Sequence, residues 1–143
     1  MDVKASLVIP AHNEETNLEE AVEEGMKKLQ EDFGQHFEII IAEDGCTDDT
    51  ENIARNISAK SEFVRHIHFE ERKGRGKALK ESFKKAKGEI VCFMDADLST
   101  DPKHISELLT PIDNGTASIA LGSRRLESSE TDRYLLRRIA SIA

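Results

Sequence analysis

Continuous apolar runs alternate with amphipathic helical segments along this chain, and this alternation limits its fold more than any other feature. Residues 37–42 (FEIIIA) and 89–94 (EIVCFM) are apolar almost throughout, which is typical of strands covered on both faces. Apolar segments at 4–10, 63–69 and 117–121 predict three further strands. Strands that alternate with helices in this way predict an α/β fold, with a mostly parallel sheet and helices on both faces.

The segments between these strands carry apolar residues at helical spacing and residues that commonly start helices. Four helices are predicted there, with starts at Asn13, at Thr47 or Asp48, near residue 75, and at Asp101 followed by Pro102. The fourth is predicted to stop near Asn114–Gly115, and residues 131–143 form a further helical segment. We expect residues 1–143 to form one domain, because this length is enough to bury a single core.

Charge and cysteine content narrow the class of protein. The formal net charge of −8 argues against general nucleic-acid binding, which needs a basic face that releases counterions. No apolar run has the roughly 20 residues that a membrane helix needs, and the amino terminus lacks the pattern of a signal peptide. Cys46 lies in a polar loop and Cys92 in an apolar strand, so we expect a reduced, cytoplasmic protein.

Polar residues gather directly after the first, second and fourth predicted strands. In parallel α/β sheets, ligands bind beyond the carboxyl ends of the strands, so these three loops predict one binding site. The first loop contains Pro10, His12, Asn13 and Glu14. The last two of these residues are also explained as a helix cap and a first-turn acid. In the second loop, Asp44 ends the strand before the turn, where helix capping does not explain an acid.

The third polar loop is Asp95-Ala96-Asp97, which follows the fourth strand. Residues two apart at the end of a strand project to the same side, so we expect these carboxylates to converge beside buried residues. Like charges are costly in such a place. A bound Mg²⁺ or Mn²⁺ removes this cost and leaves coordination sites for substrate phosphate oxygens. Asp101 already caps the next helix, which argues against a purely structural role for the pair.

Two basic segments each have two interpretations. Residues 72–78 (RKGRGKA) place two glycines and several cations at a helix start, where backbone N–H groups and positive charge suit an anion. The spacing is not that of a Walker loop, and a solvated turn explains the segment equally well. The second segment is residues 124–143, which form either a solvated helix or a surface for phosphate or an anionic membrane. Its arginines are Arg124, Arg125, Arg133, Arg137 and Arg138.

Together these motifs resemble the GT-A fold glycosyltransferases of family two. The matching segments follow the family's order and spacing over essentially the whole chain, and they are 10–14, 43–48, 73–78 and 95–97. Within the family, the Asp95-Ala96-Asp97-Leu98-Ser99 and Gly122-Ser123-Arg124 motifs are most similar to polyprenyl-phosphate (dolichyl-phosphate) sugar transferases. Cys46 departs from the family, which usually has serine there; this position mainly shapes the turn, so we expect little effect on the chemistry.

The resemblance implies roles for the matching residues. The set implied to bind the nucleotide sugar is Pro10, His12, Glu14, Asp44, Lys73, Lys77 and Asp95. The implied metal ligands for Mg²⁺ or Mn²⁺ are Asp95 and Asp97. Asp97 and Arg124 are the expected catalytic residues, with Arg124 beside a phosphate near the reaction centre.

The implied reaction is transfer of a hexose, with inversion, from a UDP- or GDP-sugar to a polyprenyl phosphate. It would take place at the cytoplasmic face of a membrane, with which the protein would make peripheral contact. A phosphate acceptor needs no carboxylate base, because its oxygen is already anionic. Positioning and electrostatic help to the leaving nucleoside diphosphate then supply the catalysis.

Two alternatives remain open. The first is a family-two transferase whose acceptor is a hydroxyl of a polysaccharide or a glycerate, and the second is a non-catalytic module that binds a sugar nucleotide. Catalytic domains of the family are considerably longer than 143 residues. The chain therefore either lacks their carboxyl-terminal part or completes its acceptor site in another way.

Overall fold

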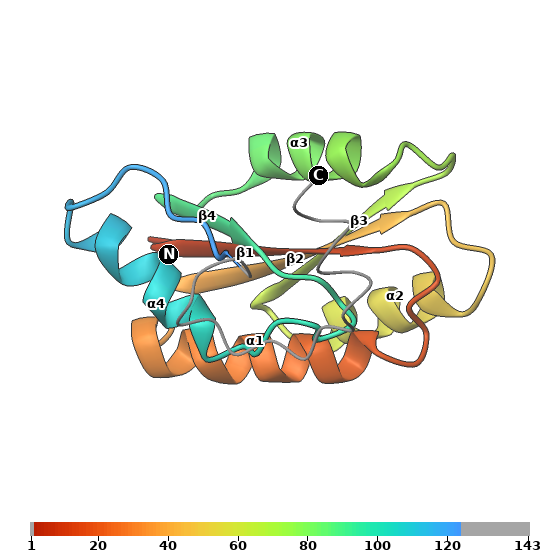
Figure 1. Cartoon of the computed structure of the whole chain (residues 1–143). Helices are drawn as coiled ribbons and strands as arrows, with labels where there is room; N and C mark the ends of the chain where they lie inside the picture. Colours follow the sequence, from red (N-terminus) through yellow and green to blue (C-terminus); the bar gives the residue numbers. More distant parts are fainter. Residues whose placement is uncertain (1, 124–143) are drawn as a thin grey trace, which may run out of the picture.

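The computed structural model describes residues 2–123, in which a parallel sheet lies between two layers of helices (Figure 1). The strands are β1 (Ala5–Ala11), β2 (Phe37–Asp44), β3 (Val64–Phe69) and β4 (Ile90–Phe93). The helices are α1 (Leu18–Phe33), α2 (Thr50–Lys60), α3 (Arg75–Lys85) and α4 (His104–Asp113). The predicted α/β class, with a mostly parallel sheet and helices on both faces, is confirmed.

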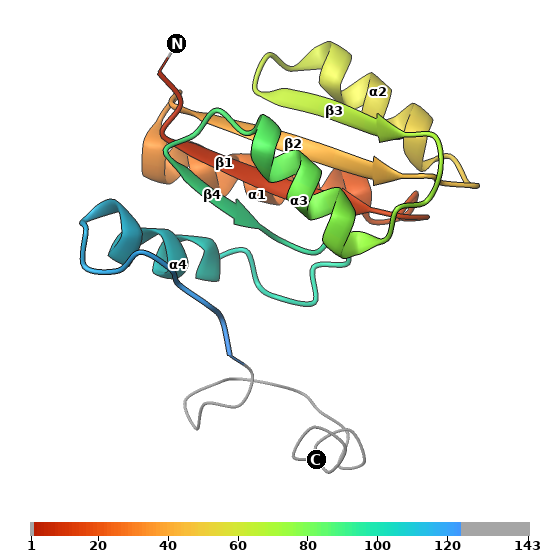
Figure 2. The ribbon, with the colours of Figure 1, turned by 90° about the horizontal axis from the view of Figure 1, so that it is seen from above.

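The strand order β3-β2-β1-β4 puts the two longest apolar strands in the middle of the sheet. Helices α1, α2 and α4 cover one face, and α3 covers the other (Figure 1). Every residue of β2 is buried, as its apolar run predicted. Alternate residues of β2 enter opposite cores, with Ile39 and Ile41 towards α1 and Ile40 and Ala42 towards α3. All the strands run the same way, so their carboxyl ends share one edge of the sheet (Figure 2).

The opposite edge of the sheet holds a buried ionic network around Glu38, which is only 4% exposed. Its carboxylate accepts hydrogen bonds from the Ser6 hydroxyl at 2.7 Å, the Arg65 guanidinium at 2.7 Å and the Lys87 N–H at 2.6 Å. Burial alone would raise the pKa of Glu38, but these donors outweigh it and hold the pKa below 4.5, the ordinary value. A buried carboxylate with this many donors joins β1, β2, β3 and the loop before β4.

Some predicted helix starts are wrong by a few residues. α1 begins at Leu18 rather than Asn13, which has a left-handed backbone with φ 56° and lies in the loop. The Asn13 side chain instead accepts a hydrogen bond from the Thr47 N–H at 2.8 Å, so it connects two loops. The side chains of Asp48 and Asp101 accept N–H groups two residues further on, just where α2 and α4 start. The predicted end of α4 at Asn114 is confirmed.

The predicted strand at 117–121 is absent from the structure. Ile119 and Leu121 are 75% and 81% exposed, and within the described residues no neighbouring strand pairs with them. An apolar run becomes a strand only where a partner supplies its hydrogen bonds. The predicted helix at 131–143 lies outside the described residues. Between residues 2 and 123, no helix combines the length and the apolar character that crossing a membrane requires.

Candidate functional site

A cavity of about 290 Å³ opens at the carboxyl edge of the sheet, between the loops that follow β1, β2 and β4 and the start of α3. This is where parallel α/β sheets bind their ligands. Its lining residues are Pro10, Ala11, His12, Glu14, Asp44, Arg72, Arg75, Ala78, Asp95, Ala96 and Asp97. The cavity thus brings together the residues predicted from all three polar loops.

The loop after β1 is fixed to the end of β2 by hydrogen bonds. His12 Nδ1 lies 2.7 Å from the Asp44 carbonyl oxygen, so this nitrogen donates a hydrogen bond there when it carries the proton. The Glu14 N–H donates to the Thr50 hydroxyl at 2.8 Å. Glu14 itself accepts a hydrogen bond from the Asn17 side chain at 2.9 Å. His12 and Glu14 are therefore held in place by β2 and α2 while they line the cavity.

Cys46 also joins these two loops. Its sulfur accepts a hydrogen bond from the Asn13 N–H at 3.3 Å and lies 3.6 Å from the Ala11 carbonyl oxygen. Burial raises the pKa of this thiol to about 11, so it stays protonated near neutral pH. Its contacts shape the turn, as the sequence led us to expect, and a serine hydroxyl could take their place.

Asp44 is only 3% exposed, and its carboxylate holds the loop between β3 and α3. One oxygen accepts the Lys73 N–H at 2.7 Å, and the other accepts the Gly74 N–H at 2.9 Å. Next to it, Gly45 has φ 57°, and a Cβ there would lie 2.6 Å from the Arg72 nitrogen. Glycine is thus required for the close approach of the two loops. Asp44 therefore forms a wall of the cavity and also fixes the basic segment beside it.

The cations that line the cavity are Arg72 and Arg75, which sequence reasoning did not select. Lys73 and Lys77 were predicted, but neither side chain lines the cavity; the Lys73 ammonium lies 5.3 Å from the centre of the Phe69 ring. Helix periodicity is a signal that could have found Arg75. Residues three apart share a helix face, so Arg75 faces the same side as the buried Ala78, whereas Lys77 does not.

The acid pair lies in a turn rather than at the end of a strand. β4 ends at Phe93, and Leu98 has a left-handed backbone with φ 52°. The alternation of a strand therefore does not bring Asp95 and Asp97 together, and that part of the prediction is wrong. The turn nevertheless places both carboxylates at the cavity. A left-handed leucine costs about 1–2 kcal/mol, and such strain is common at functional sites.

The two carboxylates have different surroundings. Asp95 is 33% exposed and forms an ion pair with Arg75, whose guanidinium lies 2.6 Å from one carboxylate oxygen and 5.4 Å from the centre of the Phe93 ring. Asp97 is exposed, and one of its oxygens accepts the Ser99 N–H at 2.9 Å. Hard oxygen ligands beside open space suit Mg²⁺ or Mn²⁺, which bind through one or two carboxylates and keep sites for phosphate oxygens. The residues present therefore fit such an ion.

This sheet, with acids at its carboxyl edge and helices on both faces, defines a protein of the GT-A fold. The chain belongs to the family "Glycosyl transferase family 2", whose sequence profile matches residues 6–142. Arg124, the remaining predicted site residue, lies outside the described residues.

Three similar proteins give the comparison more detail. The chain is 37% identical to "Glycosyltransferase AglD" of Haloferax volcanii over 99% of its length, and 35% identical to "Dolichol-phosphate mannosyltransferase" of Pyrococcus furiosus over 92%. It spans only 23% and 36% of these two proteins. The glucosyl-3-phosphoglycerate synthase of Mycobacterium tuberculosis, solved with Mn²⁺, UDP and glucosyl-3-phosphoglycerate, is 31% identical with a TM-score of 0.57. That match covers 77% of this chain and 39% of the synthase.

Proposed function

We propose that the cavity binds the nucleoside diphosphate part of a UDP- or GDP-hexose with a divalent metal ion, and that the protein transfers the hexose, with inversion, to a polyprenyl phosphate. The observation that carries the proposal is the convergence of Asp44, Asp95, Asp97 and two arginines on one cavity at the carboxyl edge of the sheet. Residues 1–143 would together form one domain that binds the nucleotide sugar.

Each wall of the cavity suits one part of the donor. The loop of Pro10, His12 and Glu14, together with Asp44, offers the nucleoside a fixed set of polar groups. Arg75 and Arg72 offer positive charge to the diphosphate, and an arginine guanidinium suits phosphate oxygens because it donates two parallel hydrogen bonds. We keep Lys73 and Lys77 as weaker, longer-range contributors of positive charge, since their side chains do not line the cavity.

Asp95 and Asp97 would hold Mg²⁺ or Mn²⁺. The similar Mycobacterium tuberculosis synthase, solved with Mn²⁺ and UDP, supports this choice of ion. When bound, the ion would neutralise negative charge on the departing nucleoside diphosphate. Arg75 contacts Asp95, so it lies where it can hold that carboxylate and also meet a diphosphate oxygen.

The acceptor is inferred from the relatives, two of which are a dolichol-phosphate mannosyltransferase and a glycosyltransferase. In the proposed step, an anionic phosphate oxygen of the lipid attacks the anomeric carbon of the hexose. The bond from that carbon to the diphosphate oxygen breaks, and UDP or GDP leaves with the electron pair. No carboxylate base is needed, and Arg124 would stabilise a phosphate. A lipid acceptor implies peripheral contact with a membrane, which we place at its cytoplasmic face.

A transfer assay tests this proposal. The full chain is incubated with radiolabelled UDP-glucose or GDP-mannose, with Mn²⁺, and with either a polyprenyl phosphate or 3-phosphoglycerate. We expect label in the lipid product and none without metal. Label only in the glycerate product would replace the proposed acceptor with a hydroxyl. No transfer, together with tight binding of the donor, would favour a module that binds the sugar nucleotide without catalysing transfer.

A further inference from the structure

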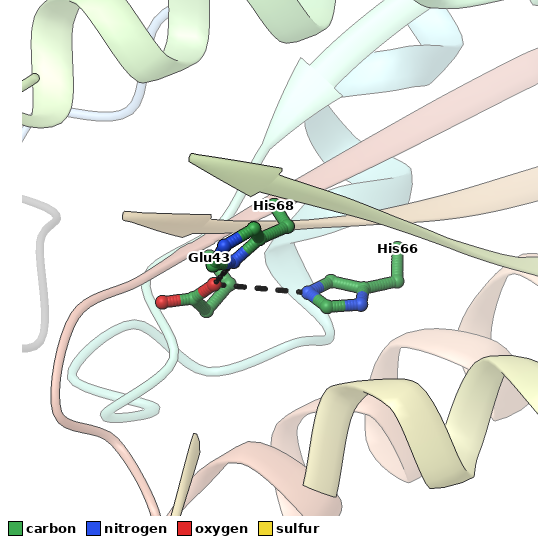
Figure 3. A group of neighbouring side chains, drawn as sticks. All are labelled: Glu43, His66 and His68. Carbon is green, nitrogen blue, oxygen red and sulfur yellow. Dashed lines mark hydrogen bonds and ion pairs between the residues drawn. The ribbon is translucent and has the colours of Figure 1, made fainter. Parts of the chain in front are cut away.

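Glu43, His66 and His68 form a cluster on the face of the sheet that α2 covers (Figure 3). Glu43 and His68 are directly opposite each other on β2 and β3, and His66 is opposite Ile41. Side chains opposite each other in a parallel sheet point the same way, as do residues two apart on a strand. Strand pairing therefore brings all three side chains to one place.

The ligand-type atoms of this cluster are close together. Glu43 Oε2 lies 2.5 Å from His68 Nδ1 and 3.9 Å from His66 Nε2, and all three atoms lie within 4.8 Å of one another. Dashed lines in Figure 3 join the Glu43 carboxylate to both imidazoles. Tetrahedral zinc ligands lie about 3.4 Å apart, given zinc–ligand bonds of about 2.0–2.1 Å. Rotations of these side chains that move their tips by about 1 Å would bring the atoms to that spacing.

His66 Nε2 has an unmet bonding requirement. The atom is buried, and it has no hydrogen-bond partner in the part of the chain that the structure describes. Burial lowers the pKa of His66, so its imidazole is neutral near pH 7 and one ring nitrogen carries a lone pair. A buried polar atom without a partner destabilises the fold. A metal ion between the two strands would give this nitrogen a partner.

The cluster also attracts positive charge. Glu43 is completely buried, while Glu51 Oε2 lies 3.9 Å from His68 Nδ1. The hydrogen bond from His68 to Glu43, with nearby Glu51 and Glu70, raises the pKa of His68. A proton that His68 shares with Glu43 therefore compensates part of the negative charge of these acids. Arg55 is a nearby cation, and it forms an ion pair with Glu51. A dication bound by Glu43 would take the place of the His68 proton.

We propose that Glu43, His66 and His68 form a binding site for a divalent transition metal of the zinc class. Two imidazoles and one carboxylate are a ligand set that Zn²⁺, Co²⁺ or Ni²⁺ prefers, whereas Mg²⁺ prefers oxygen ligands alone. Glu51 or a water molecule completes the coordination. The half-exposed His68 gives the ion a path from solvent, since its side chain is 39% exposed.

This site is separate from the donor cavity and goes beyond the proposed function. Asp44 follows Glu43 on β2, but adjacent residues of a strand face opposite sides of the sheet. None of the three ligands lines the cavity. At the turn after β2, Glu43 Oε1 accepts the Cys46 N–H at 2.7 Å, which connects the cluster to a loop beside the cavity.

Titration of the full chain with Co²⁺, a spectroscopic substitute for Zn²⁺, tests the proposal. We expect the intense visible absorption bands of a four-coordinate ion to saturate at one Co²⁺ per chain, with no charge-transfer band from a cysteine thiolate. His66→Gln should weaken binding by more than roughly 100-fold, because losing even a residue that only orients a ligand costs about 10- to 100-fold. Zn²⁺ should displace the Co²⁺.

Two control variants separate this site from other metal-binding groups. His104→Gln removes an exposed histidine that pairs with Glu107 at 2.8 Å on α4, and Asp97→Asn changes the acid pair of the cavity. His104→Gln should bind Co²⁺ as the parent chain does. Asp97→Asn should keep the intense four-coordinate bands, because Co²⁺ on the oxygen ligands of the cavity absorbs only weakly. If His66→Gln does not fold, His68→Gln and titration of the parent chain at about pH 5 and about pH 8 replace it, with binding expected only at the higher pH.

Several results would overturn the proposal. These are the absence of bound Co²⁺ at about pH 8, a weak spectrum typical of six-coordinate Co²⁺, or equal affinity in the parent chain and the His66 and His68 variants. Loss of the intense four-coordinate bands in Asp97→Asn would also overturn it, because that ion would then lie in the donor cavity.

Discussion

Strand β2 carries buried acids at both ends, and the two ends differ in what surrounds the charge. At the amino end, Glu38 is paired with the Arg65 guanidinium and with two further donors. At the carboxyl end, Asp44 is held by two backbone N–H groups, and Glu43 by one backbone N–H and an imidazole. A permanent cation thus compensates one end only.

This difference separates residues that stabilise the fold from residues that bind a ligand. The charge of Glu38 is satisfied inside the protein, so no ligand is needed there. At the carboxyl edge, the acids of the cavity face two exposed arginines and open space, which leaves them able to respond to a metal ion and a diphosphate. Substitutions at the two ends should therefore change different measured quantities.

We expect the largest effect from Asp97→Ala, on the rate of hexose transfer. Loss of a metal ligand removes several kcal/mol of charge stabilisation, and each tenfold in rate is about 1.36 kcal/mol. We expect kcat/KM for transfer to fall by more than roughly 100-fold, with the urea midpoint of unfolding unchanged, because Asp97 is exposed. Full activity in this variant would show that the acids at the carboxyl edge of the sheet do not serve ligand binding, as Glu38 at the amino end does not.

The next largest effect is on stability, at the other end of the strand. Glu38→Ala removes the acceptor of the Ser6 hydroxyl and the Lys87 N–H, while Arg65 keeps its hydrogen bond to the Lys85 carbonyl oxygen. We expect this change to cost about 2–3 kcal/mol of unfolding free energy. The cost lies below that of a fully buried pair because the Arg65 side chain is 34% exposed. Urea denaturation measures it. The affinity for UDP or GDP, measured by calorimetry below the unfolding transition, should stay within about twofold of the parent value.

A matched pair of substitutions on α3 compares a cation that lines the cavity with one that does not. Arg75→Ala removes a cation that lines the cavity and pairs with Asp95, whereas Lys77→Ala removes one that does not line it. We expect about tenfold weaker nucleoside diphosphate binding in the first variant and less than about twofold in the second. Equal losses would show that the positive charge acts at long range rather than by contact.

The smallest expected effect is on the pH dependence of the unfolding free energy, and it comes from Glu38 at the amino end of β2. The folded protein holds the pKa of Glu38 below its ordinary value of 4.5, so the ionised carboxylate stabilises the fold above that pH. This contribution is lost as the pH falls from 4.5 through the lower pKa of the folded state. The parent chain should therefore lose its advantage in unfolding free energy over Glu38→Gln across that range. An advantage that stays constant there would mean that the charge of Glu38 does not matter.

The sequence predicted the sheet well, because burial on both faces leaves a strong apolar signal. It also predicted the polar loops that meet at the cavity, since the carboxyl ends of parallel strands share one edge. It did not predict the strand at 117–121 correctly, because a strand depends on a partner that the local pattern does not show. The start of the third helix near residue 75 was predicted correctly, but the choice between Arg75 and Lys77 depended on which face of α3 lies on the sheet. The spacing from Arg75 to the buried Ala78 carried that signal.

The cluster of Glu43, His66 and His68 shows what the sequence could not reveal. The two histidines are two apart on one strand, but their proximity to Glu43 depends on the register between β2 and β3. A shift of this register by one residue would turn the strand's side chains to the other face. Asp44 was predicted as a site residue, whereas its hydrogen bonds to the 73–74 backbone appear only once the loops are folded together.

The most direct test of the donor site is calorimetric titration of the full chain with UDP and with GDP, in the presence and absence of Mn²⁺. The account predicts that one nucleotide per chain binds with Mn²⁺ present, that chelation of the metal weakens binding by at least about tenfold, and that Asp97→Asn has the same effect while Glu38→Gln does not. Binding that is equally tight without metal and in Asp97→Asn would contradict the assignment of Asp95 and Asp97, and the absence of any binding would contradict the donor site itself.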